Sequence, residues 1–154
     1  MTHLKEGDKA PIFEFTDHRG ETKSLEQFLG TKVILYSYPR DNTPGCTAEA
    51  CNLRDNYQEL QDMGFEVIGI SADSEKSHDK FRTKFELPFF LISDTEKKIL
   101  TDYGVWGEKK MMGRTYMGIH RMTFIIDEKG LIQKIFTKVN TKDHTRQILN
   151  ELNK

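Results

Sequence analysis

Short, nearly continuous apolar runs recur along this chain, and segments with helical spacing lie between them. Apolar runs of this length are typical of strands that are buried on both faces of a sheet. We predict five such strands, at residues 33–38, 65–70, 89–92, 123–126 and 131–137. The helical spacing predicts four helices, at residues 47–63, 75–85, 96–103 and 142–152. This alternating order is that of an α/β protein.

Two turn sequences refine this picture. Asp127–Gly130 joins the last two predicted strands as a hairpin, and Asp17–Gly20 predicts an earlier one. Strands joined by a hairpin are antiparallel, so the sheet should be mixed rather than wholly parallel. A strand, helix, strand core followed by a hairpin and a terminal helix is the layout of a thioredoxin-like fold. We therefore expect a mixed central sheet flanked by helices.

Residues 104–120 show no clear period and contain four glycines and three methionines. This composition predicts a long loop. Long loops in small domains often carry binding function. Met111, Met112 and Met117 would then either form an adaptable apolar lip for a substrate or reductant, or fill gaps in the packing.

The length and charge of the chain exclude several classes of protein. A chain of 154 residues can bury a core without disulfide bonds, and we expect one domain over residues 1–154. The net charge of −1, with mixed signs along the sequence, predicts neither nucleic-acid nor membrane binding. No apolar run approaches the roughly 20 residues that span a bilayer, and the first ten residues lack a signal-peptide core. We expect a cytoplasmic protein whose partners are small molecules or proteins.

Both cysteines, Cys46 and Cys51, lie near the junction between a predicted strand and the helix that follows it. Thr43 would occupy the N-cap position and Pro44 the first helical position, so Cys46 would lie in the first turn beside unpaired backbone N–H groups. A free cysteine is only about 3% ionised at neutral pH, and a helix N-terminus increases that fraction strongly. The position therefore favours a thiolate at Cys46.

The helical wheel separates the two cysteines. One stripe of the helix, which should face the sheet, consists of Cys46, Ala50, Leu53, Tyr57 and Leu60. Cys51 lies about 140° around the axis from Cys46, and their Cα atoms would be about 8.6 Å apart in a regular helix. A disulfide spans at most about 7 Å between Cα atoms. A bond between the two cysteines would therefore require local unwinding, so we predict a helical reduced form and a locally unfolded oxidised form.

The cysteine spacing leaves several functions to compare. The C-x4-C pattern differs from the C-x-x-C of a protein disulfide oxidoreductase and from a zinc knuckle. A non-enzymatic redox sensor, in which unwinding signals to a partner, remains open, as does a metal-binding module that recruits distant histidines. His3, His18, His78 and His144 show no metal-ligand spacing, and His120 is interpreted as an ordinary polar contact rather than a base.

The block formed by Pro39, Thr43, Cys46 and Glu49 resembles the active-site motif of peroxiredoxins, and Cys51 five residues later resembles their Q-type, or bacterioferritin comigratory protein, group. The resemblance extends over nearly the whole chain. It includes residues 7–11, 33–38, 103–109 and 121–127.

The resemblance implies a role for each motif residue. Cys46 would be the peroxidatic cysteine, which becomes a sulfenic acid, and Cys51 would be the resolving thiol that forms a disulfide with it. Arg121 would neutralise the thiolate and orient the peroxide. Thr43 would hydrogen-bond in the pocket, Pro39 would shield the sulfur, and Glu49 would organise Arg121. These roles fit displacement at an O–O bond, because fixed donors stabilise the charge on the leaving oxygen.

The resemblance also implies the partners. The chain would be a thioredoxin-dependent peroxidase that reduces hydrogen peroxide and organic hydroperoxides to water or alcohols in antioxidant defence. Thioredoxin or a similar dithiol protein would reduce its disulfide, and neither a metal nor an organic cofactor would be needed. No long arm follows the last predicted helix, so we expect a monomer.

Overall fold

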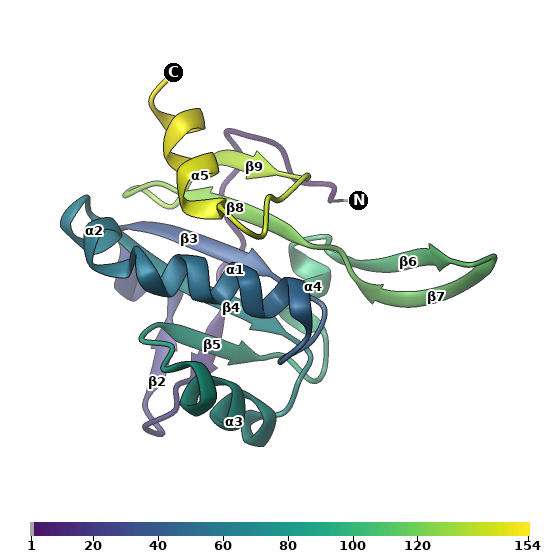
Figure 1. The fold of residues 1–154 in the computed structure, drawn as a ribbon. Coiled ribbons are helices and arrows are strands. Elements are labelled where there is room, and N and C mark those ends of the chain that lie inside the picture. The colour runs from purple at the N-terminus through teal and green to yellow at the C-terminus, as the bar shows by residue number, and fades with distance from the viewer. Residues whose placement is uncertain (1) are drawn as a thin grey trace.

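A mixed sheet of five strands forms the centre of the computed structural model, which describes residues 2–154 (Figure 1). The strand order is β5-β4-β3-β8-β9. β3, β4 and β5 run parallel, and β8 and β9 are antiparallel to their neighbours, as the hairpin at Asp127–Gly130 predicts. The strands are β3 (Lys32–Ser37), β4 (Phe65–Ser71), β5 (Phe90–Ser93), β8 (Met122–Ile126) and β9 (Ile132–Phe136).

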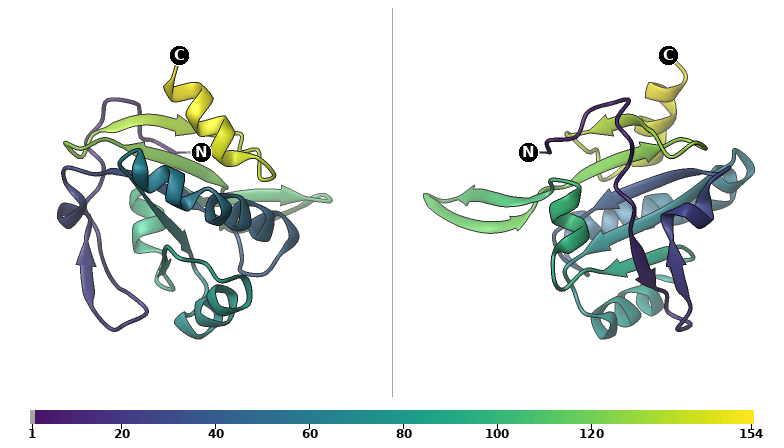
Figure 2. Two further views of the ribbon diagram at one scale, coloured as in Figure 1. Left: turned by 60° about the vertical axis from the view of Figure 1, so that its left-hand side comes forward. Right: turned by 180° about the vertical axis from the view of Figure 1, so that it is seen from behind.

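Helices and loops cover both faces of this sheet (Figure 2). One face packs against α1 (Pro44–Asp55), α2 (Tyr57–Asp62), α3 (Glu75–Phe85) and α5 (His144–Leu152). The other packs against the N-terminal segment, the hairpin of β1 (Glu14–Thr16) and β2 (Thr22–Ser24), the short 3-10 helix η1 (Leu25–Phe28) and α4 (Lys98–Asp102). The β1–β2 hairpin turns at Asp17–Gly20, as predicted.

The period of two along β3 explains why the core has two halves. Ile34 and Tyr36 point toward α1, whereas Val33 and Leu35 point toward the N-terminal segment and α4. All four side chains are buried, which confirms the prediction that these strands are covered on both faces. Each fully buried apolar side chain of this size stabilises the fold by about 1.5–3 kcal/mol. The architecture is the predicted thioredoxin-like one.

The helix predicted over residues 47–63 is interrupted at Asn56. α1 begins at Pro44 and ends at Asp55, and α2 begins at Tyr57. Asn56 has φ −110° and ψ 10°, and its side-chain amide donates to the carbonyl of Asn52 at 2.8 Å. The side chain thus takes the acceptor that the backbone N–H would use in a continuous helix. The sequence period continues across this break, which is why the pattern alone does not show it.

The prediction of a loop at residues 104–120 was wrong. β6 (Trp106–Met111) and β7 (Arg114–Ile119) form an antiparallel hairpin that extends away from the main sheet (Figure 1). Its two-residue turn has left-handed backbone at Met112 (φ 52°) and Gly113 (φ 80°), which suits the twist of a hairpin. Asparagine or aspartate usually precedes such a glycine, and most of the hairpin is exposed, so neither the turn signal nor an apolar alternation marks it.

The methionines of this hairpin are exposed rather than used to fill gaps. Met111 is 60% exposed, Met112 95% and Met117 51%. Across residues 2–154, no helix combines the length and the apolar character needed to cross a membrane.

Candidate active site

Cys46 lies in the first turn of α1 and is almost completely buried, with 1% of its surface exposed. Pro44 begins the helix and Thr43 is the N-cap residue, as predicted. The Thr43 hydroxyl, however, makes no capping hydrogen bond and donates instead to the carbonyl oxygen of Arg40 at 2.9 Å. The hydroxyl therefore leaves the N–H groups of the first turn free to act on the sulfur of Cys46.

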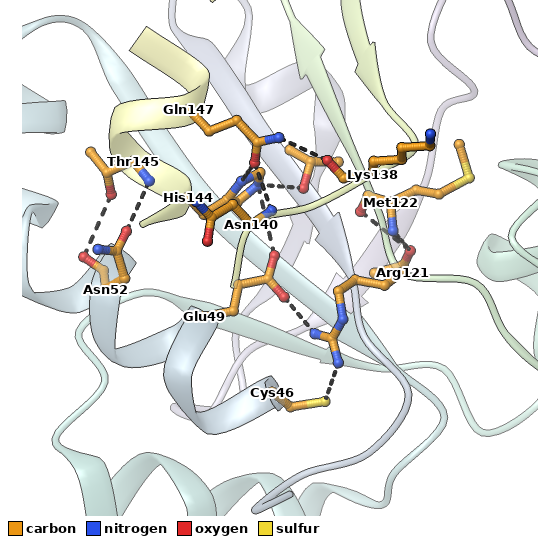
Figure 3. A network of polar contacts seen from close by, with 12 residues as sticks. Cys46, Glu49, Asn52, Arg121, Met122, Lys138, Asn140, His144, Thr145 and Gln147 are labelled. Atoms are coloured by element: carbon orange, nitrogen blue, oxygen red, sulfur yellow. Dashed lines mark hydrogen bonds and ion pairs between the residues drawn. The ribbon is translucent and has the colours of Figure 1, made fainter. Parts of the chain in front are cut away.

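Arg121, directly before β8, joins two groups of α1 that are far from it in the sequence (Figure 3). Its Nη2 lies 3.3 Å from Sγ of Cys46, and its Nη1 lies 2.7 Å from Oε1 of Glu49. Burial by itself lowers the pKa of Arg121, but the contacts with Cys46 and Glu49 outweigh burial and raise that pKa above its usual value. The guanidinium is therefore a permanent positive charge beside the thiol.

The backbone on each side of Arg121 is fixed to the end of β3. The Ser37 hydroxyl donates to the carbonyl of His120 at 2.7 Å and accepts from the N–H of Met122 at 3.2 Å. Gly45 provides the room that the guanidinium needs, because a Cβ atom at this position would lie only 3.2 Å from Nη2 of Arg121. The sequence pattern marks neither Ser37 nor Gly45, since their importance depends on an arginine that lies directly before β8 and is distant in the sequence.

Glu49 is completely buried between Arg121 and His144. Its Oε2 has no hydrogen-bond partner among the described residues and lies 3.7 Å from Nε2 of His144. Burial raises the pKa of Glu49 to about 7, although Arg121 opposes this shift. Burial also lowers the pKa of His144 to about 4. At neutral pH the two groups are therefore not an ordinary pair of full opposite charges.

Cys51 is half-buried on the same helix, and both cysteines are free thiols. α1 is continuous from Pro44 to Asp55, so the reduced form is helical through both cysteines, as predicted. Of the predicted stripe, Cys46, Ala50, Leu53 and Leu60 are buried against the sheet, whereas Tyr57 is half-buried and donates to Glu66 Oε1 at 2.6 Å.

The loop from Pro39 to Thr43 is anchored through Asp41. Its carboxylate accepts hydrogen bonds from Tyr38 at 2.7 Å and Ser77 at 2.8 Å, and lies 2.7 Å from Nδ1 of His78. Its backbone N–H donates to Asp73 at 2.8 Å. These contacts tie the loop that precedes Cys46 to α3 and to the segment between β4 and α3. Pro39 is half-buried at the start of this loop.

Asp41, Asp73 and His78 bring ligand-type atoms within 4.8 Å of one another. Each of the three side chains forms hydrogen bonds with protein groups, so the cluster serves as an anchor within the protein. The sequence did not indicate this cluster, because Asp41 is distant along the chain from Asp73 and His78.

Lys109 of β6 brings a second cation toward the same region. Its ammonium donates to the carbonyl of Ile119 at 2.9 Å. Burial and the nearby charge of Arg121 lower the pKa of Lys109, while the charge of Cys46 opposes them. The incorrect prediction of a loop at residues 104–120 concealed this residue, since only the hairpin turns Lys109 toward Arg121.

Comparison of the sequence with known proteins agrees with this arrangement. The profile of the AhpC/TSA family matches residues 6–135. Peroxiredoxin Bcp of Escherichia coli (strain K12) is 45% identical over 152 residues, which cover 99% of this chain and 97% of that protein. Peroxiredoxin Bcp of Bacillus subtilis (strain 168) is 44% identical over 146 residues, covering 95% of this chain and 93% of that protein.

Solved structures give the same result. A cysteine-to-serine mutant of PrxQ from Xylella fastidiosa superposes with a TM-score of 0.91 at 29% identity, covering 99% of this chain and 98% of that one. A bacterioferritin comigratory protein from Xanthomonas campestris, described for its alkyl peroxide reduction activity, has a TM-score of 0.86 at 30% identity, with coverages of 99% and 95%. With a buried cysteine beside an arginine at the start of α1, and with matches over nearly its whole length, this chain belongs to the AhpC/TSA family and is a thiol peroxidase similar to the Bcp, or Q-type, peroxiredoxins.

Proposed function

We propose that Cys46 is the peroxidatic cysteine. Its thiolate attacks one oxygen of a hydroperoxide, the O–O bond breaks, and the leaving oxygen takes a proton to become water or an alcohol. Cys46 is oxidised to a sulfenic acid in this step. The observation that carries the proposal is the 3.3 Å contact between Nη2 of Arg121 and Sγ of Cys46 at the N-terminus of α1. The guanidinium stabilises the thiolate first and the charge on the leaving oxygen afterwards.

Three further residues would prepare the site for peroxide. Thr43 donates its hydroxyl hydrogen to Arg40, so its oxygen can accept the hydrogen of a bound peroxide. Pro39, at the start of the loop that precedes Cys46, would shield the sulfur from bulk water. Glu49 holds the guanidinium by accepting from Nη1 at 2.7 Å. Because Arg121 donates to both Glu49 and Cys46, its plane is fixed relative to the sulfur.

Cys51 would resolve the sulfenic acid. Its thiol sulfur bonds to the sulfur of Cys46, the S–O bond breaks, and water leaves, so that the two cysteines form a disulfide. In the helix the two Cα atoms are about 8.6 Å apart, beyond the roughly 7 Å that a disulfide spans. Part of α1 must therefore unwind in each cycle, and this unwinding competes with over-oxidation of Cys46 by a second peroxide.

Thioredoxin or a similar dithiol protein would then reduce the Cys46–Cys51 disulfide and be oxidised in its turn. Hydrogen peroxide and alkyl hydroperoxides are the proposed substrates, and the alkyl peroxide reduction described for the Xanthomonas relative supports the second class. This cycle removes peroxides at the expense of cellular thiols, which is an antioxidant function. A single chain contains both cysteines, so the proposed working unit is the monomer.

The test is peroxide consumption coupled to thioredoxin, thioredoxin reductase and NADPH. We expect Cys46→Ser to abolish turnover, and Cys51→Ser to stop thioredoxin-dependent turnover while a single peroxide is still consumed per chain. Unchanged turnover in Cys46→Ser would overturn the central assignment. If the wild type formed the disulfide without sustained turnover, the redox-sensor interpretation would take its place.

A further inference from the structure

The buried groups around Cys46 do not balance in charge unless one proton is added. Arg121 supplies one positive charge, while a Cys46 thiolate and a Glu49 carboxylate would supply two negative ones. Cys46 is 1% exposed and Glu49 0%, so water does not compensate either charge. Lys109 is partly exposed and donates to a backbone carbonyl. With Cys46 as the reacting thiolate, the site is therefore most stable with one proton on a group close to Glu49.

His144, at the first position of α5, is the group that faces the free oxygen of Glu49 (Figure 3). Nε2 of His144 lies 3.7 Å from Oε2 of Glu49, which has no hydrogen-bond partner within residues 2–154. Both side chains are completely buried. When Glu49 is ionised and His144 is neutral at Nε2, these two atoms are both acceptors and repel each other. A single proton on either atom makes the contact favourable.

The hydrogen bonds of His144 determine which of its nitrogens is free to exchange that proton. Gln147 donates its amide to the carbonyl of Lys138 at 2.7 Å and accepts from the N–H of Asn140 at 2.8 Å, so its oxygen faces Nδ1 of His144 at 2.9 Å. Nδ1 must therefore carry a hydrogen. Nε2 lies 2.8 Å from the Thr123 hydroxyl, which can donate to a lone pair or accept from an N–H. Only Nε2 can gain or lose a proton without breaking a hydrogen bond.

We propose that Glu49 and His144 together hold one proton up to about neutral pH, and that this proton leaves the positive charge of Arg121 to the Cys46 thiolate. The proton count is the same for a carboxylic acid beside a neutral imidazole and for a carboxylate beside an imidazolium. His144 is thus a positioning residue, which acts on the sulfur through Glu49 and Arg121. This inference rests on the proposed role of Cys46 as the reacting thiol.

The surroundings of the pair support this count. Burial raises the pKa of Glu49 to about 7, so the pair loses its last proton only near neutral pH. Tyr36 faces Glu49 from β3, and burial together with the charge of Glu49 raises the pKa of Tyr36 well above its usual value, so Tyr36 stays neutral. From β9, the Phe136 ring packs edge-on against His144, with 5.8 Å between the ring centroids. On the β8 side of Glu49, Arg121 is the one charged side chain among residues 2–154 that forms an ion pair or hydrogen bond with Glu49.

The first experiment measures the proton directly, by NMR titration of protein labelled with ¹³C at glutamate carboxyls and ¹⁵N at histidine rings. Glu49→Gln and His144→Ala assign the two signals. We expect the wild-type pair to carry one proton at pH 6, on either residue, and to lose it near pH 7. In Glu49→Gln we expect His144 to be neutral at pH 6. A pair that is already proton-free at pH 6, with Glu49 titrating near its ordinary value of 4.5, would overturn the proposal.

The second experiment separates this role from a merely structural one. His144→Ala lets water reach Oε2, so Glu49 ionises and draws on the charge of Arg121. We expect the second-order rate constant of Cys46 with hydrogen peroxide to fall about tenfold. A change of one pKa unit at Glu49 corresponds to a factor of ten in its protonation equilibrium, and Arg121 couples Glu49 to the sulfur. Adding Glu49→Gln, which cannot ionise, should raise the rate of the His144→Ala variant. A double variant as slow as His144→Ala, or slower, contradicts the proposal.

The experiments distinguish the role of Cys46 from that of His144. If Cys46→Ser retained peroxidase turnover, the proposed function would fail whatever the titration showed. If Cys46→Ser were inactive and the pair held no proton at pH 6, the peroxidase assignment would stand and only the role of His144 would fall. His18→Ala, in the exposed turn after β1, is the matched control for loss of a histidine and should leave both the titration and the rate unchanged.

Discussion

Asp41 and His78 form a buried ion pair that anchors the loop in front of Cys46, with 2.7 Å between Oδ2 and Nδ1. Nε2 of His78 lies 3.0 Å from the carbonyl of Ile92, which can only accept, so this nitrogen carries a hydrogen. Burial raises the pKa of Asp41, but hydrogen bonds from His78 and Tyr38 outweigh burial and bring that pKa below its usual value. The ionised carboxylate of Asp41 can only accept, so Nδ1 of His78 donates to it.

Loss of this pair should destabilise the fold. In His78→Ala the Asp41 carboxylate stays buried without its partner on α3, and we expect the free energy of unfolding to fall by about 3 kcal/mol. Urea unfolding measures this change. The neighbouring Asp79 pairs with Arg82 while 65% of its side chain is exposed, so Asp79→Asn should cost less than about 1 kcal/mol. Equal costs for the two variants would show that His78 and Asp41 are not a buried ion pair.

A side chain at position 45 should disturb the contact between Arg121 and Cys46. The added Cβ of Gly45→Ala would lie 3.2 Å from Nη2, so the guanidinium must move away from the sulfur. We expect the rate constant with hydrogen peroxide to fall about tenfold, equivalent to about 1.4 kcal/mol of transition-state stabilisation. Stopped-flow measurement gives this rate. Gly107→Ala is the control, because its Cβ would make an ordinary 3.5 Å contact with His120 and should change the rate little.

Replacement of Arg121 by lysine should not preserve activity. The guanidinium donates from one nitrogen to Cys46 and from another to Glu49, which a single ammonium cannot reproduce. We expect Arg121→Lys to lower the rate constant with peroxide about 100-fold and to reduce the thiolate absorbance of Cys46 at neutral pH. Arg114→Lys, exposed on β7, is the matched control. A rate within a few-fold of wild type in Arg121→Lys would mean that charge alone suffices.

The pH dependence of stability should reveal Glu49 and His144 as opposing contributions. The raised pKa of Glu49, from 4.5 to about 7, makes stability fall as the pH rises through this range. The lowered pKa of His144, from 6.5 to about 4, makes stability rise between those values. The two effects cancel between pH 4.5 and 6.5 in the wild type. In Glu49→Gln, which lacks the contribution of Glu49, stability should therefore rise with pH in this range, whereas the stability of the wild type should change little.

The slope in Glu49→Gln is at most about 1.4 kcal/mol per pH unit, because one proton is involved. Urea unfolding of both proteins at several pH values measures it. A wild-type slope as steep as that of Glu49→Gln would contradict the assigned directions.

Asn52, next to Cys51, should control how readily α1 unwinds. Its side chain accepts from the N–H of Thr145 at 2.8 Å and donates to the carbonyl of Lys142 at 3.3 Å, which ties α1 to the start of α5. Asn52→Ala removes both bonds. At about 1 kcal/mol for each bond, the open form should become at least fivefold more populated. We expect faster disulfide formation after a peroxide pulse and less over-oxidation of Cys46, both measured by mass spectrometry.

Asn150→Ala, at an exposed position of α5, is the control for Asn52→Ala and should not alter disulfide formation. If Asn52→Ala formed the disulfide no faster than this control, unwinding near Cys51 would not limit the rate of disulfide formation.

The sequence by itself determined the parts of this protein that depend on neighbouring residues. The apolar runs determined the five central strands, Asp17–Gly20 and Asp127–Gly130 determined two hairpins, and Thr43 and Pro44 placed Cys46 in the first turn of a helix. Backbone preferences and side-chain period act over a few residues, so they are visible in order along the chain. The hairpin at residues 106–119 was missed because an exposed hairpin lacks that period.

The tertiary structure alone decided which distant groups meet. The resemblance to peroxiredoxins pointed to Arg121, but the antiparallel register that pairs Ser37 with Met122 is what holds its backbone beside α1. The packing of α5 over α1 brings His144 to Glu49, and both side chains are buried there. These contacts shift the pKa values of Glu49 and His144, because burial penalises their charged forms. Burial depends on all the elements that surround a residue, so no local pattern in the chain encodes it.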